Sequence, residues 1–318
     1  MLEDFREYNP NFPINQFCHM IFSGQEKETD KRVIISTWQS VYNNPSKYFK
    51  DFGAIIVDEA HEAKADSLKG ICQKAIHAPF RFGFTGTLDD LKYHRLIIEG
   101  LCGPVFRTTN TKHLMDNKIV SELNINCLVL KYNDEVRNNN KKFKYQDEMK
   151  FIVNNSKRNK FIANLTKSIN NDKNILILTA YKNHINLLKK ELEQTGREVL
   201  VVTGDTDPDE RKRVRQYAQN NNGVIILATY GVYYRGISIK NLQYVILATN
   251  YKSMIRILQT LGRGLRLDGK ENKVTALDII DDFGFGKRMN YIVQHFIKRV
   301  KIYALEQFSY KIKNINIK

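Results

Sequence analysis

The 318-residue sequence lacks the features that mark a secreted, membrane-bound or disulfide-stabilised protein. No apolar run reaches the roughly 20 residues of a membrane span, and the N-terminus does not place a charged stretch before an apolar one, as a signal peptide does. Cysteines are few and far apart, without a Cys-x-x-Cys pair, so we expect reduced thiols and neither disulfides nor a zinc site. These absences predict a cytoplasmic protein with no membrane partner. The four cysteines are Cys18, Cys72, Cys102 and Cys127.

Acidic residues are also fewer than basic ones, and this imbalance is confined to one part of the chain. Lys and Arg number 50 against 34 Asp and Glu, which gives a formal net charge of +16. Residues 1–122 carry a net charge of −1, and residues 123–318 carry a net charge of +17. A basic domain beside a near-neutral one favours a polyanionic partner, with nucleic acid the leading candidate. A solvated lysine-rich surface is the alternative interpretation.

Apolar runs that alternate with helical stretches predict an α/β fold. With 42% apolar residues the chain can bury real cores, which excludes disorder as its main state. Most of the runs are continuous, which is typical of parallel strands covered on both faces, with sites at their carboxyl ends. The length and the change in charge predict two domains, residues 1–122 and 123–318, with a boundary near residues 116–124. We expect strands at Val33–Ser36, Ala54–Val57, Phe82–Thr85, Ile125–Lys131, Ile175–Thr179, Glu198–Thr203, Val224–Ala228, Tyr244–Ala248 and Val274–Ile280.

The segments between and after these strands predict helices and one polar excursion. Asp207-Pro208 pairs a capping side chain with a proline at the first helical position. Asn133–Met149 is highly charged and rich in asparagine, and we interpret it as a surface excursion. The last 30 residues predict an amphipathic helix docked on the sheet by Ile292, Val293, Phe296, Ile297, Val300 and Tyr303, with Lys298, Arg299 and Lys301 on its other sides. Further helices are expected at His184–Gln194, Asp209–Gln219 and Ser253–Leu261.

Two carboxylates stand directly after one predicted strand, in the sequence Asp58-Glu59-Ala60-His61. The strand Ala54–Val57 delivers them to the carboxyl edge of the sheet, where phosphates bind. Asp58 can hold Mg²⁺, usually through water, and Glu59 can orient and deprotonate an attacking water. A lone Asp-Glu pair after a strand is often only the start of a loop. Asp-Glu-Ala-His directly after four apolar residues is far more specific.

A second strong pattern is Q-x-x-G-R-x-x-R, which runs from Gln259 through Arg263 to Arg266. It resembles motif VI of the superfamily 2 helicases, and this resemblance implies arginines that reach a bound nucleotide, where an arginine can stabilise the charge of phosphoryl transfer and raise its rate by about 10³–10⁵. The alternative is a basic helix end that contacts the phosphates of a nucleic acid.

These two patterns resemble motifs II and VI of the superfamily 2 helicases with Asp-Glu-Ala-His lettering, and weaker signals fall in the order of that family. Each weak signal is ordinary alone, so their shared order carries the assignment. The resemblance implies two RecA-like parallel-sheet domains, ATP and Mg²⁺ as cofactors, and nucleic acid as the partner. The weaker stretches are Val33–Val41, which resembles the T-x-Q turn before motif II, Thr85–Thr87 for motif III, Ile175–Tyr181 for motif IV and Val224–Gly236 for motif V.

The resemblance also implies roles for single residues. Catalysis would involve Asp58, Glu59, His61, Gln259, Arg263 and Arg266, with Asp58 as the Mg²⁺ ligand. Nucleotide binding would use Asp58, Glu59, Gly236, Arg263 and Arg266, while Thr85, Gly86 and Thr87 would couple nucleotide state to domain closure. Contacts to the nucleic acid would come from Thr37, Gln39, Thr179, Thr229 and Tyr230. Ser238 stands where many relatives have Asp.

Further details resemble the UvsW-type phage helicases of recombination and repair, over nearly the whole chain. The similar stretches include Thr37–Val41, Phe82–Leu88, Ser121–Asn126, Tyr230–Val232 and Gly236–Leu242. Such helicases couple ATP hydrolysis to translocation on branched DNA, and they also dissociate RNA–DNA hybrids. The resemblance therefore implies DNA as the substrate and, for a phage protein, the cytoplasm of the host cell.

A P-loop, G-x-x-x-x-G-K-[ST], is missing from the sequence, although a motor of this superfamily needs one to cradle the phosphates. The near-match Gly264–Glu271 has Glu in place of the Mg²⁺-binding hydroxyl and overlaps the arginine pattern; Gly286-Lys287-Arg288 fails likewise. We therefore expect the chain to begin inside the first RecA-like domain. One interpretation is the carboxyl-terminal portion of a helicase, which hydrolyses ATP only with a separate N-terminal fragment. The other is a complete remnant without ATPase activity that binds nucleic acid.

Overall fold

The computed structural model describes all residues except 1–4, 7, 23–25, 62–65, 86–91, 107, 110, 119–120, 235–238, 240, 250–272 and 318. The chain divides into two compact units, Met1–Arg107 and Thr108–Lys318. This division precedes the short helix α6 (Thr111–Asp116), whereas the charge balance of the sequence changes after residue 122. Among the described helices, none is both long and apolar enough to cross a lipid bilayer.

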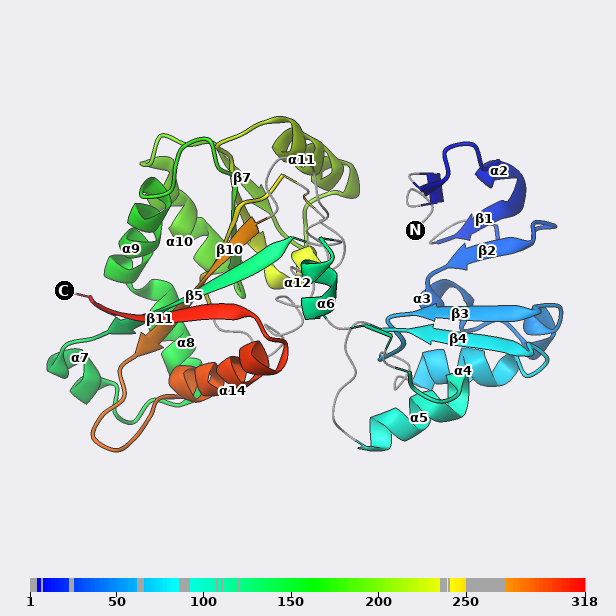
Figure 1. Cartoon of the computed structure of the whole chain (residues 1–318), viewed down its shortest axis with the longest axis horizontal. Coiled ribbons are helices and arrows are strands. Elements are labelled where there is room, and N and C mark those ends of the chain that lie inside the picture. The colour runs from blue at the N-terminus through cyan, green and yellow to red at the C-terminus, as the bar shows by residue number, and fades with distance from the viewer. Residues whose placement is uncertain are drawn as a thin grey trace. The chain divides into compact units, whose positions relative to one another are not determined.

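Unit 1 contains two separate pairs of parallel strands among its described residues. β1 (Cys18–Ile21) pairs with β2 (Val33–Ser36), and β3 (Ala54–Asp58) pairs with β4 (Phe80–Phe84). α4 (Asp66–Lys74) and α5 (Lys92–Cys102) lie along β3 and β4 (Figure 1). The helices earlier in the chain are α2 (Ile14–Phe17), α3 (Trp38–Val41) and the 3₁₀ turn η1 (Ser46–Phe49).

Unit 2 is built on a seven-stranded sheet in which every described pair of neighbouring strands is parallel. This confirms the predicted α/β fold class. The central strands are buried on both faces, as their continuous apolar runs predict; all five residues of β6 are buried. In sheet order the strands are β11 (Ser309–Asn316), β5 (Glu122–Lys131), β10 (Lys273–Asp282), β9 (Tyr244–Leu247), β6 (Ile175–Thr179), β8 (Ile225–Thr229) and β7 (Val199–Val202).

Helices connect these strands, with one difference from the prediction. Asn133–Met149 is not simply a surface excursion, because it forms α7 (Asp134–Asn139) and the start of α8 (Tyr145–Asn154), and Glu148 and Met149 are buried. Burial raises the pKa of Glu148, whose carboxylate accepts hydrogen bonds from the backbone N–H groups of Tyr291 and Ile292 at 3.0 and 3.2 Å. The predicted helix Ser253–Leu261 lies outside the described residues. The remaining helices are α9 (Ser156–Lys167), α10 (Lys182–Glu193), α11 (Pro208–Asn220) and α12 (Tyr230–Tyr234).

The predicted amphipathic helix is α14 (Tyr291–Leu305), and it packs on β10 as expected. The placement of Arg299 on a solvent-facing side is wrong, because this side chain is buried. Its Nε and Nη2 donate to the two carboxylate oxygens of Asp278 at 3.0 and 3.1 Å, and the Tyr303 hydroxyl donates to the same carboxylate at 2.9 Å. Arg299 lies seven residues after Ile292 and therefore shares its helical face, while the carboxylate on β10 balances its charge.

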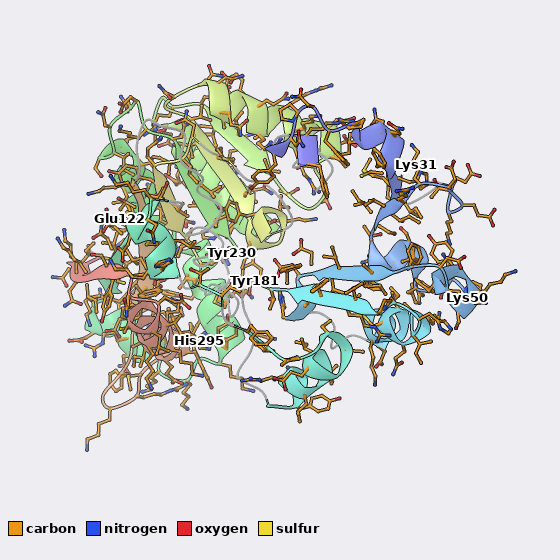
Figure 2. All side chains as sticks on the ribbon, turned by 45° about the vertical axis from the view of Figure 1, so that its right-hand side comes forward. Lys31, Lys50, Glu122, Tyr181, Tyr230 and His295 are labelled. Atoms are coloured by element: carbon orange, nitrogen blue, oxygen red, sulfur yellow. The ribbon has the colours of Figure 1, made fainter. Side chains whose placement is uncertain are left out.

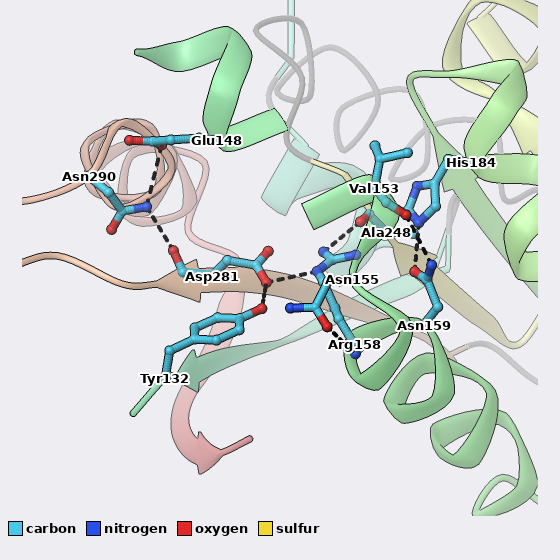
Figure 3. A network of polar contacts seen from close by, with 10 residues as sticks. All are labelled: Tyr132, Glu148, Val153, Asn155, Arg158, Asn159, His184, Ala248, Asp281 and Asn290. Atoms are coloured by element: carbon cyan, nitrogen blue, oxygen red, sulfur yellow. Dashed lines mark hydrogen bonds and ion pairs between the residues drawn. The ribbon is translucent and has the colours of Figure 1, made fainter. Parts of the chain in front are cut away.

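A second buried ion pair lies at the carboxyl edge of this sheet (Figure 3). Arg158, in the first turn of α9, donates through Nε to Asp281 at 2.7 Å, and neither side chain is exposed. Arg158 also donates through Nη2 to the carbonyl oxygen of Ala248 at 2.7 Å, and the Tyr132 hydroxyl donates to Asp281 at 2.7 Å. The pair thus joins α9 to the ends of β5, β9 and β10.

Candidate nucleotide and nucleic-acid site

The two predicted catalytic carboxylates lie at the carboxyl end of β3, and both are exposed. Glu59 has a left-handed backbone, with φ of 51°, which is uncommon for a residue other than glycine. Its backbone N–H donates to the Asp58 carboxylate at 2.9 Å. The sharp turn after Asp58 therefore presents both carboxylates to solvent at the sheet edge where phosphates bind in this class of fold.

His61 connects the carboxylate turn to the loop after β4. The imidazole is buried, with 3% exposure, and its Nδ1 lies 3.1 Å from Glu59 Oε2 and 2.9 Å from Thr85 Oγ1. Because a carboxylate can only accept, a hydrogen bond to Glu59 requires a hydrogen on Nδ1. One buried ring thus links a predicted catalytic residue to Thr85, the first residue of the predicted coupling segment.

Gly83 is a site residue that the sequence analysis missed. A Cβ atom at this position would lie 2.9 Å from Cβ of Ala60 and 3.2 Å from Sγ of Cys102. Ala60 belongs to the Asp-Glu-Ala-His turn and is fully buried, so β4 can approach this turn only where it carries no side chain. A glycine inside an apolar strand was the available signal, because it indicates a close backbone approach.

The residues at the end of β3 fit a magnesium–nucleotide complex. Mg²⁺ prefers oxygen ligands and is usually held by one or two carboxylates together with water and substrate phosphates. The exposed Asp58 carboxylate can serve in this way, and Glu59 stands beside it at the same exposed turn. Within the described residues there is no group of three or more histidine, cysteine or acidic side chains that could hold a metal alone.

Thr37 and Gln39 are exposed at the start of α3, in unit 1. The Thr37 hydroxyl is 2.9 Å from that of Ser40, and the Ser36 hydroxyl donates to the Ile21 carbonyl at 3.2 Å. These bonds fix the turn after β2, and both predicted side chains remain accessible to a nucleic-acid backbone.

The predicted contacts of unit 2 divide into one accessible and two buried residues. Thr229 is partly exposed at the end of β8. Thr179 is fully buried, and its hydroxyl is 2.8 Å from Nδ1 of His184. Tyr230 (labelled in Figure 2) is buried, its hydroxyl donates to the Thr249 carbonyl, and burial raises its pKa. In this structure neither the Thr179 nor the Tyr230 side chain is accessible to a ligand, because each hydroxyl group is buried and hydrogen-bonded within unit 2.

A chain of hydrogen bonds runs from Val153 through Asn159 to His184 (Figure 3) and ends at the buried Thr179 hydroxyl. The Asn159 amide donates to the Val153 carbonyl at 3.0 Å, so its oxygen faces Nε2 of His184 at 2.9 Å. Nε2 must then carry the hydrogen, and Nδ1 of the neutral ring accepts from the Thr179 hydroxyl. Burial, followed by the nearby positive charge of Arg158, lowers the pKa of His184 to about 3. The sequence carried no signal for this histidine.

The other predicted site residues, Gly86, Thr87, Gly236, Gln259, Arg263 and Arg266, lie outside the described residues. Their roles remain predictions. Two hydrogen bonds hold the last described residues before Gln259–Arg266. The Thr249 hydroxyl accepts from the backbone N–H of Ala180 at 2.7 Å, and the N–H of Ala248 donates to the Leu178 carbonyl at 2.8 Å.

Comparisons with known proteins agree with this geometry. The family model "Type III restriction enzyme, res subunit" matches residues 1–90, and the model "Helicase conserved C-terminal domain" matches residues 156–268. The chain belongs to the superfamily 2 helicases, whose RecA-like fold it has. Within them it is similar to the ATP-dependent DNA helicase UvsW of Enterobacteria phage T4, with 36% identity over 340 residues that cover 100% of this chain and 66% of UvsW.

Solved structures agree with the RecA-like fold. The crystal structure of T4 UvsW matches with a TM-score of 0.57 and 33% identity, covering 100% of this chain and 65% of that one. Dbp5 of S. cerevisiae bound to RNA and ADP BeF3 matches with a TM-score of 0.59, covering 99% of this chain and 74% of that one, and at 15% identity it supports the fold alone. This chain spans between 37% and 66% of the length of the curated relatives it matches.

Proposed function

We propose that this chain is the carboxyl-terminal portion of an ATP-dependent DNA helicase or translocase. The observation that carries the proposal is the arrangement at the end of β3, where His61 joins Glu59 to Thr85 beside the exposed carboxylate of Asp58. This arrangement gives a magnesium ligand, a residue to orient water, and a direct contact to the loop that would respond to the nucleotide. A protein that only bound nucleic acid would have no chemical need for it.

The proposed substrate is branched DNA, such as a fork or a four-way junction, or an RNA–DNA hybrid, handled in phage recombination, repair or replication in the host cytoplasm. The support is the 36% identity to a phage protein named as an ATP-dependent DNA helicase. The net charge of +17 on residues 123–318 supports a nucleic-acid partner in general. DNA rather than RNA follows only from that relative, since motors of this kind contact mainly backbone phosphates.

Hydrolysis in this proposal uses a P-loop that these 318 residues do not contain. The N–H groups and lysine of such a loop hold the phosphates, so ATP and Mg²⁺ bind productively only when a P-loop segment is supplied. We propose that a separate N-terminal helicase fragment supplies it. Asp58, Glu59, Gly236, Arg263 and Arg266 would complete the nucleotide site.

The test is DNA-stimulated ATP hydrolysis by the purified chain, alone and mixed with an N-terminal helicase segment that carries G-x-x-x-x-G-K-[ST]. We expect no turnover from the chain alone and turnover from the mixture that Asp58→Ala and Arg266→Ala abolish. Arg266→Ala should leave DNA affinity almost unchanged, because its proposed partner is the nucleotide. Robust turnover by the chain alone that disappears in Asp58→Ala would contradict the need for a second fragment.

The missing P-loop motif favours a second candidate, a nucleic-acid-binding or regulatory remnant without ATPase activity. The same mixture decides between the two. If a P-loop polypeptide binds the chain but no hydrolysis appears with any branched DNA, the remnant is the better description. The DNA sequence directly upstream of codon 1 is the first observation to make, because a P-loop reading frame there favours the helicase.

A further inference from the structure

Two loops with no helicase motif lie together at the carboxyl edge of the unit 2 sheet. One loop, Asn140–Lys144, joins α7 to α8, and the other is the turn Phe285–Arg288 between β10 and α14. We call them the paired loops. They follow the parallel neighbours β5 and β10, so they stand at the same sheet edge as Thr229 at the end of β8.

The turn Phe285–Arg288 is a rigid two-residue hairpin. The N–H of Phe285 donates to the Arg288 carbonyl at 3.1 Å, and the N–H of Arg288 donates back at 3.0 Å. Gly286 occupies the first central position with φ of +60°, where this turn favours glycine. A Cβ on Gly284 would lie 2.8 Å from the Arg288 carbonyl oxygen, so a glycine is needed there as well. The turn therefore holds the residues at its tip in one orientation.

Two arginines fasten the paired loops to each other. The guanidinium of Arg288 donates to the carbonyl oxygens of Lys141 and Phe143, the second at 2.8 Å. Arg137, in α7, donates through Nε to the Gly284 carbonyl at 2.7 Å. Both guanidinium groups are thus committed to the backbone, and they form a fixed platform from segments almost 150 residues apart.

An aromatic ring and several lysines project from this platform. Phe285 is 43% exposed, and the ammonium group of Lys141 lies 5.9 Å from the centre of its ring. Lys142 and Lys287 are exposed, with no ion-pair partner among the described residues.

The acidic groups nearby mostly have other partners. Asp134 pairs with Arg137 at 3.0 Å, Asp147 accepts the Lys144 backbone N–H at 2.9 Å, and Asp282 pairs with Lys131; Glu135 is exposed. The face around Phe285 is therefore basic with an exposed aromatic ring.

We propose that the paired loops are an accessory binding site for single-stranded nucleic acid. Phe285 stacks against a base, and Lys141, Lys142 and Lys287 contact phosphates, which is the combination that binds single strands without regard to sequence. β10 stands three strands from β8, or about 14 Å at the usual strand spacing, so one bound strand can span Thr229 and the paired loops. The proposal rests on the nucleic-acid substrate of the proposed function and adds a surface outside the helicase motifs.

The test is fluorescence anisotropy of the full chain with a labelled oligo-dT of about 20 nucleotides, which exceeds the 4–16 nucleotides that one binding fold covers. Phe285→Leu keeps an apolar side chain but removes the stacking face, and we expect it to weaken binding by about 5- to 160-fold. The double variant Lys142→Gln with Lys287→Gln should lower the slope of log affinity against log salt by about 1.4, from two lost phosphate contacts.

The matched control is Lys167→Gln with Lys190→Gln, which removes the same charge from the ends of α9 and α10 at the opposite edge of the sheet. We expect this control to change the slope much less. All four lysines and Phe285 are exposed, so far-UV circular dichroism should show the native fold in every variant.

Three outcomes would overturn the proposal. An equal change in slope in both double variants would mean diffuse attraction to a basic surface. Unchanged affinity in Phe285→Leu, or displacement of the oligonucleotide by polyglutamate at equal charge, would exclude stacking. In these cases the proposed helicase function still stands, whereas a wild-type chain that binds no DNA at low salt would contradict both proposals.

Discussion

The neutral, buried His184 predicts a measurable dependence of stability on pH. In the folded chain its pKa is lowered to about 3, chiefly by burial, whereas its ordinary value is 6.5. Between these two values the unfolded chain binds a proton that the folded chain does not. Stability from this group is therefore complete above the unfolded pKa, and it is lost as the pH falls through that value towards the folded one.

The size of the effect follows from the two pKa values. Lowering the pH from 7.5 to 5 should cost the folded state about 2 kcal/mol through this one group. His184→Gln removes the titration and the hydrogen bond from the Thr179 hydroxyl, so the variant is less stable at pH 7.5. Because it has no proton to gain, the difference between wild type and variant should shrink by that same amount at the lower pH.

The assay is urea unfolding of the full chain at several pH values, followed by far-UV circular dichroism. The single tryptophan, Trp38, lies in unit 1, so its fluorescence separates the transition of that unit from the transition of unit 2. His113→Gln is the control, because His113 is exposed on α6 and its replacement should leave the pH profile of unit 2 intact.

Parallel pH profiles for the wild type and His184→Gln would refute this reasoning. Such a result would mean that His184 titrates alike in the folded and unfolded chains. The chain of hydrogen bonds from Val153 to Thr179 would then not require the neutral ring.

Other predictions concern packing beneath the site. Gly83→Ala places its new methyl group against Ala60, so the free energy of unfolding of unit 1 should fall by about 1–3 kcal/mol. Trp38 fluorescence should then show a lower urea midpoint, and an unchanged midpoint would mean that the Asp-Glu-Ala-His turn shifts at no cost. Arg299→Met leaves the buried Asp278 without its cation and should cost unit 2 about 3–5 kcal/mol in urea unfolding. Tyr303→Phe removes one hydrogen bond and should cost only about 1 kcal/mol, so equal losses in these two variants would contradict the ion pair.

The sequence was informative wherever a residue's own side chain decided its environment. The continuous apolar runs at Ile175–Thr179 and Val224–Ala228 are typical of a sheet covered on both faces, and the structure confirms parallel strands there. The Asp-Glu-Ala-His turn was placed correctly at a carboxyl strand end for the same reason. By contrast, the strand β11 was missed, because its side chains are mostly exposed and its pairing depends on β5.

The sequence failed wherever the environment came from a partner on another helix or strand. Arg299 looks like a surface cation until Asp278, 21 residues earlier, is seen beneath it. Thr179 and Tyr230 stand where the sequence predicts accessible strand ends. In the structure both are buried, with the Thr179 hydroxyl bonded to His184 and the Tyr230 hydroxyl bonded to the Thr249 carbonyl. His61 and Thr85 are 24 residues apart and belong to two different predicted motifs. The sequence shows the order of these motifs along the chain but not the contact between them.

The position of β5 in the sheet has a consequence for synthesis on the ribosome. Its two sheet neighbours are β10 and β11, and Asn124 pairs with Ser309, 185 residues later in the chain. At the usual translation rate of 5–20 residues per second, β11 is synthesised about 10–40 s after β5. Through this interval the apolar side chains of Leu123, Ile125 and Cys127, which are buried in the folded chain, belong to a nascent chain whose sheet is incomplete, so folding of unit 2 depends on its last-made strands.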